Sequence, residues 1–336
     1  MSDTNRIYTL AARPVGFPKE SDFALIEEAV PEIGDGEILI RTKALSVDPY
    51  MRGRMNDAKS YAAPYEIGKA VYGGSAGEVV QSKNPGFSEG DLVLGGWGWM
   101  DYFKSDGSMI QKHDPELSSL TARLGILGMP GMTAYFGFID LCEPSEGKNV
   151  FVSGAAGAVG EAVGQIAKIK GCRVVGSAGS DEKVERLLSE AGYDEAFNYK
   201  TDTDYPAKMR ELFPKGIDCY FDNVGGAMTD AVMMNLATYA RISICGAISQ
   251  YNLTAPEMAP RLMTMLLVTQ SRAEGFIVSR FADRFPEGVK QMAQWIKEGK
   301  LKYREDIVDG LENTPKAFIR MLNGENKGKQ LVNVSL

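Results

Sequence analysis

The spacing of apolar and polar residues changes near residue 125 and divides the chain into two parts. Before that point, short β-rich runs alternate with glycine-containing turns, as in residues 37–42, 71–80 and 91–97. Short strands separated by such turns are typical of a twisted, partly closed β structure. We therefore predict a β domain over residues 1–125.

After residue 125, strand-like and helix-like segments alternate. Residues 149–153 form a short apolar run, and residues 157–170 carry apolar side chains at helical spacing. A further helix is expected at 181–191, and further strands at 173–176, 196–198, 217–222 and 241–246. Strand–helix alternation of this kind predicts an α/β fold with a doubly wound parallel sheet.

The last part of the chain returns to β-type runs, at residues 306–308 and 329–334. Because the parallel sheet is complete by about residue 278, we expect this tail to rejoin the first domain. The predicted division is residues 1–125 plus 301–336 for the β domain and 126–300 for the parallel-sheet domain.

A glycine-rich loop, Ser153–Gly160, lies between the first predicted strand of the second domain and the helix that follows. Its spacing is G-x-x-G-x-x-G. Glycines allow a tight turn and let backbone amides approach a pyrophosphate, and the helix N-terminus adds partial positive charge. In this strand–loop–helix context the motif predicts a dinucleotide site. The alternative is a structural glycine turn in an unrelated α/β protein.

The end of the next strand, Val175–Ser180, lacks the acidic residue that usually binds the ribose 2′-hydroxyl of NAD. Small polar residues there leave room for a 2′-phosphate, and Lys183 can supply a cation. NADP(H) is therefore the predicted cofactor. Lys183 could instead be a solvated helix charge.

Composition argues against several other functions. The chain has one histidine, His113, and four widely spaced cysteines, so a three- or four-ligand zinc site is not expected. A net charge of −7 argues against nucleic-acid binding. The sequence has no apolar run long enough to predict a membrane span. Residues 1–13 lack the apolar region of a signal peptide. The scattered cysteines are typical of a protein in a reducing compartment. We expect a cytoplasmic protein.

Five motifs in order resemble one family: residues 45–52 (LSVDPYMR), 127–135 (LGMPGMTAY), 155–160 (AAGAVG), 221–226 (FDNVGG) and 245–252 (CGAISQYN). Together they are similar to the zinc-free medium-chain dehydrogenase/reductases. Within these, they resemble the leukotriene B4 dehydrogenase/prostaglandin reductase group, and most closely the NADPH-dependent curcumin reductases.

The resemblance implies a GroES-like β domain for substrate and a Rossmann domain for NADPH. It implies reduction of the activated double bond of an enone or enal, with hydride delivered to the β-carbon and a proton from a tyrosine or water to the α-carbon. A small-molecule substrate, no metal, and a homodimer follow from it, with the apolar stretch Met258–Val268 as a candidate contact.

The resemblance also assigns cofactor contacts. The pyrophosphate would lie on the loop, the 2′-phosphate near Lys183, and the nicotinamide near residues from three later segments. The full set is Met129, Thr133, Gly157, Ala158, Val159, Gly160, Lys183, Tyr199, Asn223, Cys245, Gly246, Ala247, Ile248, Ser249, Tyr251, Phe276, Ile277, Val278 and Asn326.

Tyr50 and Tyr251 are the candidate catalytic residues, because a phenol can donate a hydrogen bond to a developing enolate. They could instead be a packing tyrosine and a loop aromatic. The candidate substrate pocket comprises Tyr50, Met51, Arg52, Trp97, Trp99 and Tyr102. Core packing explains the last three equally well. Arg52 and Arg54 could attract an acidic substrate or pair with Asp48 and Asp57.

Two other functions remain open at this point. A quinone reductase of the same superfamily would share the hydride chemistry and differ in its pocket. A non-catalytic NADPH-binding sensor would need the glycine loop and Lys183 but not Tyr50 or Tyr251.

Overall fold

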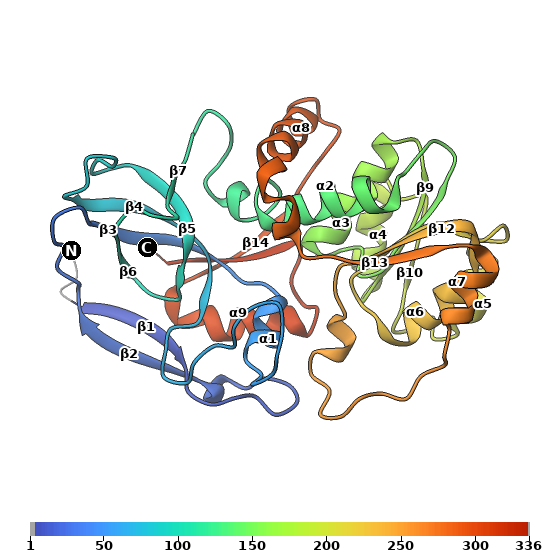
Figure 1. Ribbon diagram of the computed structural model, residues 1–336, viewed down its shortest axis with the longest axis horizontal. Coiled ribbons are helices and arrows are strands. Elements are labelled where there is room, and N and C mark those ends of the chain that lie inside the picture. The colour runs from blue at the N-terminus through green and yellow to red at the C-terminus, as the bar shows by residue number, and fades with distance from the viewer. Residues whose placement is uncertain (1–3, 335–336) are drawn as a thin grey trace. The chain divides into compact units, whose positions relative to one another are not determined.

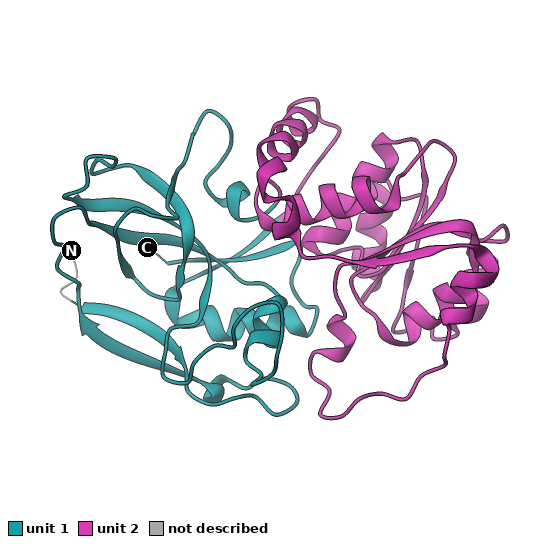
Figure 2. Ribbon diagram, in the orientation of Figure 1, with its two compact units in different colours: residues 1–125, 305–336 teal, residues 126–304 magenta. Residues whose placement is uncertain are grey.

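The computed structural model describes residues 4–334. They separate into two compact units, one of residues 4–125 and 305–334 and one of residues 126–304 (Figure 2). The chain thus re-enters the first unit at Glu305, close to the predicted boundary at 301.

The first unit contains a seven-stranded sheet and a two-stranded hairpin (Figure 1). The sheet order is β14-β15-β3-β4-β5-β7, and β6 also pairs with β3. The hairpin is β1 (Thr4–Leu10) with β2 (Phe23–Ala29), and the sheet strands are β3 (Ile38–Ser46), β4 (Tyr72–Ser82), β5 (Leu92–Gly98), β6 (Tyr102–Ser105), β7 (Gln111–Lys112), β14 (Glu305–Asp309) and β15 (Lys329–Asn333).

Two α-helices belong to this unit, α1 (Tyr50–Arg54) and α9 (Thr314–Leu322). The core beside them is aromatic: the Trp99 ring lies 5.6 Å from Phe23 and 6.1 Å from Phe318, measured between centroids. Because β15 pairs antiparallel with β3, this C-terminal strand is part of the sheet. In this pairing Leu331 lies opposite Ser46, the second residue of the 45–52 motif.

The second unit contains a six-stranded parallel sheet of order β10-β9-β8-β11-β12-β13. Its strands are β8 (Asn149–Val152), β9 (Arg173–Ala178), β10 (Glu195–Asn198), β11 (Ile217–Asp222), β12 (Leu236–Ile244) and β13 (Arg272–Gly275). Its helices are α2 (Met129–Cys142), α3 (Ala158–Ile169), α4 (Asp181–Ser189), α5 (Tyr205–Leu212), α6 (Gly226–Met233), α7 (Met263–Thr269) and α8 (Phe285–Lys297).

This strand order is the doubly wound arrangement in which the chain reverses direction across the sheet between β8 and β11. Ligands of such sheets bind outside the carboxyl ends of the strands at that reversal. The predicted glycine loop follows β8, so the topology places it at that point. No helix within residues 4–334 has the length and apolar character needed to cross a bilayer.

Candidate cofactor and substrate sites

The loop between β8 and α3 requires glycine at two positions. Gly154 has φ = 61°, a left-handed conformation that other residues rarely adopt. A Cβ at Gly160 would lie 2.4 Å from the Gly154 carbonyl oxygen, which is too close. Gly157 caps α3 without a side-chain hydrogen bond, and a Cβ built there meets only that oxygen, at 3.4 Å. The loop therefore fits a pyrophosphate at an uncapped helix N-terminus.

Asp222, at the end of β11, joins this loop to its neighbour. Its carboxylate is buried and accepts hydrogen bonds from donors on four segments. These are Ser153 Oγ (3.1 Å), Tyr220 Oη (2.8 Å), the Val224 and Gly225 amides (2.9 and 2.8 Å) and Thr229 Oγ1 (2.6 Å). The Asn223 side-chain amide adds a 2.8 Å bond to the Ser153 carbonyl. The loops after β8 and β11 are thus connected by side chains.

Residues 245–251 lie against the same end of β11. The Cys245 and Gly246 amides donate to the Asp222 carbonyl, at 2.9 and 3.0 Å. The Ala247 amide donates to the Tyr251 hydroxyl at 3.3 Å, and burial raises the pKa of Tyr251. Burial also raises the pKa of Cys245 to about 12, so its thiol stays protonated at neutral pH. A thiol that stays protonated is a poor nucleophile.

The two predicted 2′-phosphate residues, Lys183 and Tyr199, each contact the segment that follows β9. Ser180 caps α4 by accepting a hydrogen bond from the Lys183 amide at 3.3 Å, which puts Lys183 in the first turn of α4. A Cβ at Gly179 would lie 2.8 Å from the Tyr199 hydroxyl, so that ring packs on the strand end. The Asp181 carboxylate accepts from Asn198 at 2.7 Å. The buried Ser177 hydroxyl makes no hydrogen bond within the part of the chain described.

The remaining predicted cofactor residues lie in three other places. Met129 and Thr133 form the first turn of α2, where the threonine hydroxyl donates to the Met129 carbonyl at 2.8 Å. Phe276, Ile277 and Val278 follow the end of β13. The structure places Asn326 in the first unit, where its side chain donates to the Gly328 carbonyl at 2.6 Å.

Tyr50 is the first residue of α1 and is partly buried against the core of the first unit. Its pKa is raised, first by burial and second by the charge of Asp48. Asp48 in turn lies 3.1 Å from the ammonium of Lys329, which also donates to the Val47 and Gln330 carbonyls at 2.9 Å. Burial lowers the pKa of Lys329. This buried pair connects β15 to the segment that leads into Tyr50.

Three of the four aromatic pocket candidates are buried in the first unit. Trp97 and Trp99 are 1% and 0% exposed, and Tyr102 is 4% exposed. Trp97 donates to Thr42 Oγ1 at 2.9 Å, and Trp99 lies in the core beside Phe23. Their placement corresponds to the packing alternative. Met51 is also buried there, and a Cβ at Gly73 would lie 2.4 Å from its methyl group.

The two arginines of the 45–54 segment bind neighbouring protein groups. Arg52 is buried and donates to the Asn56 side chain at 2.6 Å and to the Gly16 carbonyl at 2.8 Å. Arg54 donates to the Ala63 carbonyl at 3.0 Å and lies over the Tyr65 ring. These contacts are with groups other than Asp48 and Asp57, the partners that the sequence suggested for a structural role.

Tyr193 lies close to the glycine loop, although the sequence did not point to it. Its hydroxyl donates to the Gly160 carbonyl at 2.7 Å, and its ring fills the space above two glycines. A Cβ at Gly164 would lie 2.1 Å from the ring, and one at Gly176 would lie 2.7 Å from it. Gly164 and Gly176 could have indicated this in the sequence, because glycines on neighbouring elements leave space for a large side chain from elsewhere in the chain.

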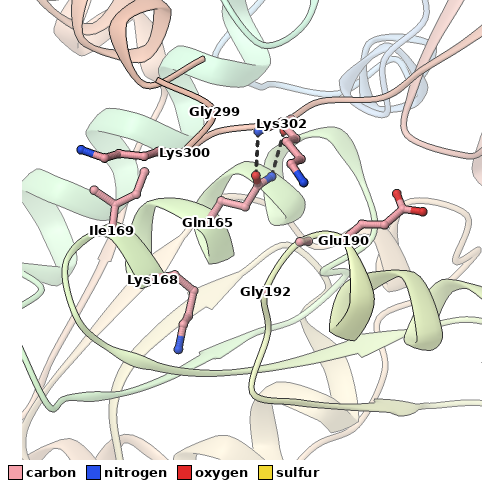
Figure 3. Close-up of a pocket in the computed structure, with 9 residues that line it drawn as sticks. Gln165, Lys168, Ile169, Glu190, Gly192, Gly299, Lys300 and Lys302 are labelled. Atoms are coloured by element: carbon pink, nitrogen blue, oxygen red, sulfur yellow. Dashed lines mark hydrogen bonds between the residues drawn. The ribbon is translucent and has the colours of Figure 1, made fainter. Parts of the chain in front are cut away.

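A pocket of about 450 Å³ lies elsewhere in the second unit, against the last turns of α3 (Figure 3). Gln165 forms two hydrogen bonds to the Lys302 backbone there, at 2.9 and 2.7 Å. Lys168 pairs with Asp194, and Lys300 pairs with Glu298, so two of its cations are already neutralised. None of the predicted site residues lines this pocket.

Within residues 4–334 no group of three or more His, Cys, Asp or Glu side chains is placed to bind a metal ion. Burial lowers the pKa of His113, which keeps its imidazole neutral at pH 7.

Two family models match this chain. One describes the N-terminal domain of oxidoreductases and covers residues 6–113, and the other, described as zinc-binding dehydrogenase, covers residues 158–298. The chain is 45% identical to the NADPH-dependent curcumin reductase of Escherichia coli, over 98% of this chain and 97% of the relative. It is 44% identical to a tobacco NADP⁺-dependent 2-alkenal reductase, over 99% and 98%.

A solved structure agrees with these relatives. CurA of Vibrio vulnificus in complex with NADPH superposes with a TM-score of 0.94 at 44% identity, covering 98% of this chain and 99% of that one. The chain belongs to the medium-chain dehydrogenase/reductases. Within this superfamily it falls in the group of NADPH-dependent double-bond reductases, which confirms the predicted fold class, enzyme class and NADP(H) dependence.

Proposed function

We propose that this protein reduces the conjugated double bond of α,β-unsaturated ketones and aldehydes with NADPH. The observation that carries the proposal is the strand-end site itself: a glycine loop at an uncapped helix, beside a strand end without an acidic residue. Relatives named as curcumin, 2-alkenal and prostaglandin reductases support the substrate class.

The residues of the second unit would bind NADPH at three points. Loop residues 157–160 would meet the pyrophosphate, Lys183 and Tyr199 the 2′-phosphate, and residues 245–251 and 276–278 the nicotinamide end. NADPH supplies a hydride to the β-carbon of the substrate when it is bound. The protein supplies orientation and the groups that receive the charge appearing on the substrate oxygen.

Tyr50 and Tyr251 are proposed to act on that oxygen and on the α-carbon. The raised pKa of each phenol keeps it protonated at neutral pH, so each can donate a hydrogen bond. The Tyr251 hydroxyl accepts from the Ala247 amide, which leaves its own proton for donation. Tyr50 or a water would then deliver the proton to the α-carbon.

The assembly and location are also proposals. Helix α7 buries no side chain, and Met263, Leu267 and Val268 are 76%, 76% and 69% exposed. The neighbouring strand β13 is an edge of the parallel sheet. A second copy of this chain covering both would form the expected homodimer. Four free cysteines support a reducing, cytoplasmic location.

The function is tested by following NADPH absorbance with a long-chain enal, a benzylidene ketone, curcumin and a quinone. We expect turnover of the first three, with deuterium from labelled NADPH found on the β-carbon of the product. Turnover of the quinone alone would favour quinone reductase. NADPH binding without turnover of any substrate would favour the sensor alternative.

A further inference from the structure

A buried ion pair lies directly beneath the glycine loop, and the proposed mechanism does not use it. Arg186 donates from both terminal nitrogens to the two carboxylate oxygens of Glu161, at 3.1 and 2.6 Å. Both side chains are 9% exposed. A two-point contact of this kind fixes the relative orientation of the two groups as well as their distance.

The two partners come from the two helices that begin at the cofactor site. Glu161 lies in the first turn of α3, four residues after Gly157, and Arg186 comes from the last turn of α4. Arg186 also approaches the Ala156 carbonyl of the glycine loop, at 3.5 Å. The pair therefore joins the helix expected at the pyrophosphate to the helix that carries Lys183.

The position of Glu161 creates an electrostatic problem for an anionic ligand. A carboxylate in the first turn interacts favourably with the positive end of the helix, which is the same feature that attracts a pyrophosphate. In a buried setting, charges are screened less than in water, so an uncompensated Glu161 would repel the ligand. The Arg186 guanidinium cancels this charge at the distance of a hydrogen bond.

The surroundings of Glu161 contain few other charges that could replace Arg186. Glu190 follows α4 and adds a like charge, and Arg304 contributes a more distant opposite charge. Tyr193 also lies close enough for its pKa to be raised by Glu161. Burial raises the pKa of Glu161 even beside Arg186, so removing the arginine would raise it further.

We propose that Arg186 is a positioning residue for NADPH: it neutralises Glu161 and joins α3 to α4, so that the pyrophosphate and 2′-phosphate regions bind one cofactor together. The proposal rests on the proposed NADPH site but not on the substrate. A binding measurement with NADP⁺ therefore tests it even if no enone is reduced.

The test measures NADP⁺ affinity by calorimetry for the full chain and three variants: Arg186→Met, Glu161→Gln and the double variant. The measurement is made at about pH 8, because Glu161 is more ionised at alkaline pH. There we expect the Arg186→Met variant to bind NADP⁺ about tenfold more weakly than the parent protein. We expect the double variant to recover most of this loss, because it has no unpaired charge. The matched control is Arg173→Met, which removes a more exposed pair with Glu195 elsewhere in the same unit; it should change binding by less than about twofold.

The pH profile separates charge neutralisation from a purely structural role. For Arg186→Met, the loss relative to the parent protein should shrink as the pH is lowered, because burial raises the pKa of Glu161 and the carboxylate becomes protonated. Titration of the cofactor's own phosphate cancels in that ratio. A loss that is independent of pH, or that persists in the double variant, would overturn the proposal.

Glu161→Gln keeps the proposal testable if Arg186→Met fails to fold, which circular dichroism would reveal. This variant leaves the arginine cation beneath the loop, so NADP⁺ should bind as tightly as in the parent protein or more tightly. A tenfold weakening in a folded Glu161→Gln protein would show that the carboxylate itself is required, contrary to the proposal.

Discussion

The cofactor end of the second unit and the candidate substrate residues of the first unit differ in how their residues are arranged. In the second unit, residues from three separate strand ends meet at the carboxyl edge of one parallel sheet. Several of them are glycines, and several act through their backbone amides. In the first unit, the candidates Trp97, Trp99 and Tyr102 lie in the core. Tyr50, the first residue of α1, is the residue of this unit to which we assign a catalytic role.

The difference has a physical origin. A backbone phosphate site needs a local turn and a helix start, and both have sequence signatures a few residues long. A side-chain pocket depends on which aromatic residues are buried in the core and which line the pocket. This division depends on packing between segments that are far apart in the sequence. A phosphate-binding loop therefore has a local sequence signature, whereas a side-chain pocket has none.

Each region also has a buried ion pair, and the two pairs are expected to fail differently. Lys329 pairs with Asp48 in the first unit, where both side chains are 6% exposed. Lys329→Met should leave Asp48 as an unpaired buried charge and destabilise the protein by about 3–5 kcal/mol, measured by urea unfolding. The double variant Asp48→Asn/Lys329→Met should recover part of this. A loss below about 1 kcal/mol would mean that the pair does not organise the segment before Tyr50.

The cofactor region is tested most strongly at Gly160. Gly160→Val would place its side chain against the Gly154 carbonyl, so the loop must shift, and we expect NADPH affinity to fall at least about hundredfold. Gly34→Ala is the control, because Gly34 is exposed in the first unit and a Cβ there meets only the Glu37 side chain, no nearer than 3.4 Å. Equal affinity in both variants, measured by NADPH fluorescence, would exclude the loop from the site.

A variant at Lys183 tests whether the segment that follows β9 binds the 2′-phosphate end of the cofactor. Lys183→Ala should weaken NADPH binding about tenfold to thirtyfold and leave NADH binding nearly unchanged, because only NADPH carries the 2′-phosphate. The control Lys208→Ala removes a lysine that pairs with Glu211 on α5. If NADH binding falls by the same factor as NADPH binding, the lysine does not recognise the phosphate.

The smallest expected effect concerns Tyr50. Tyr50→Phe should lower kcat about tenfold with NADPH affinity unchanged, and the exposed Tyr239→Phe should change neither. Since the pKa of Tyr50 is raised, its phenol stays protonated at alkaline pH, and kcat should not fall between about pH 7 and about pH 9 through loss of this proton. A fall in that range in the parent protein that Tyr50→Phe abolishes would contradict this assignment.

The elements that the sequence predicted were those with strong local patterns. The helix expected at 157–170 is α3, and the strand expected at 217–222 is β11. The hairpin of β1 and β2 was not predicted, since five of the seven β2 residues are exposed and its apolar and polar residues do not alternate. Helix α9 was also missed, although its apolar side chains face the core of the first unit.

The sequence by itself determined the family, the glycine loop and the preference for NADP(H), because these depend on residue types a few positions apart. Only the tertiary structure showed that Asp222 links the loops after β8 and β11, that Tyr193 fills the space left by two glycines, and that Arg186 pairs with Glu161. Each of these contacts joins residues more than 15 positions apart. Their energetics depend on burial, which no local pattern encodes.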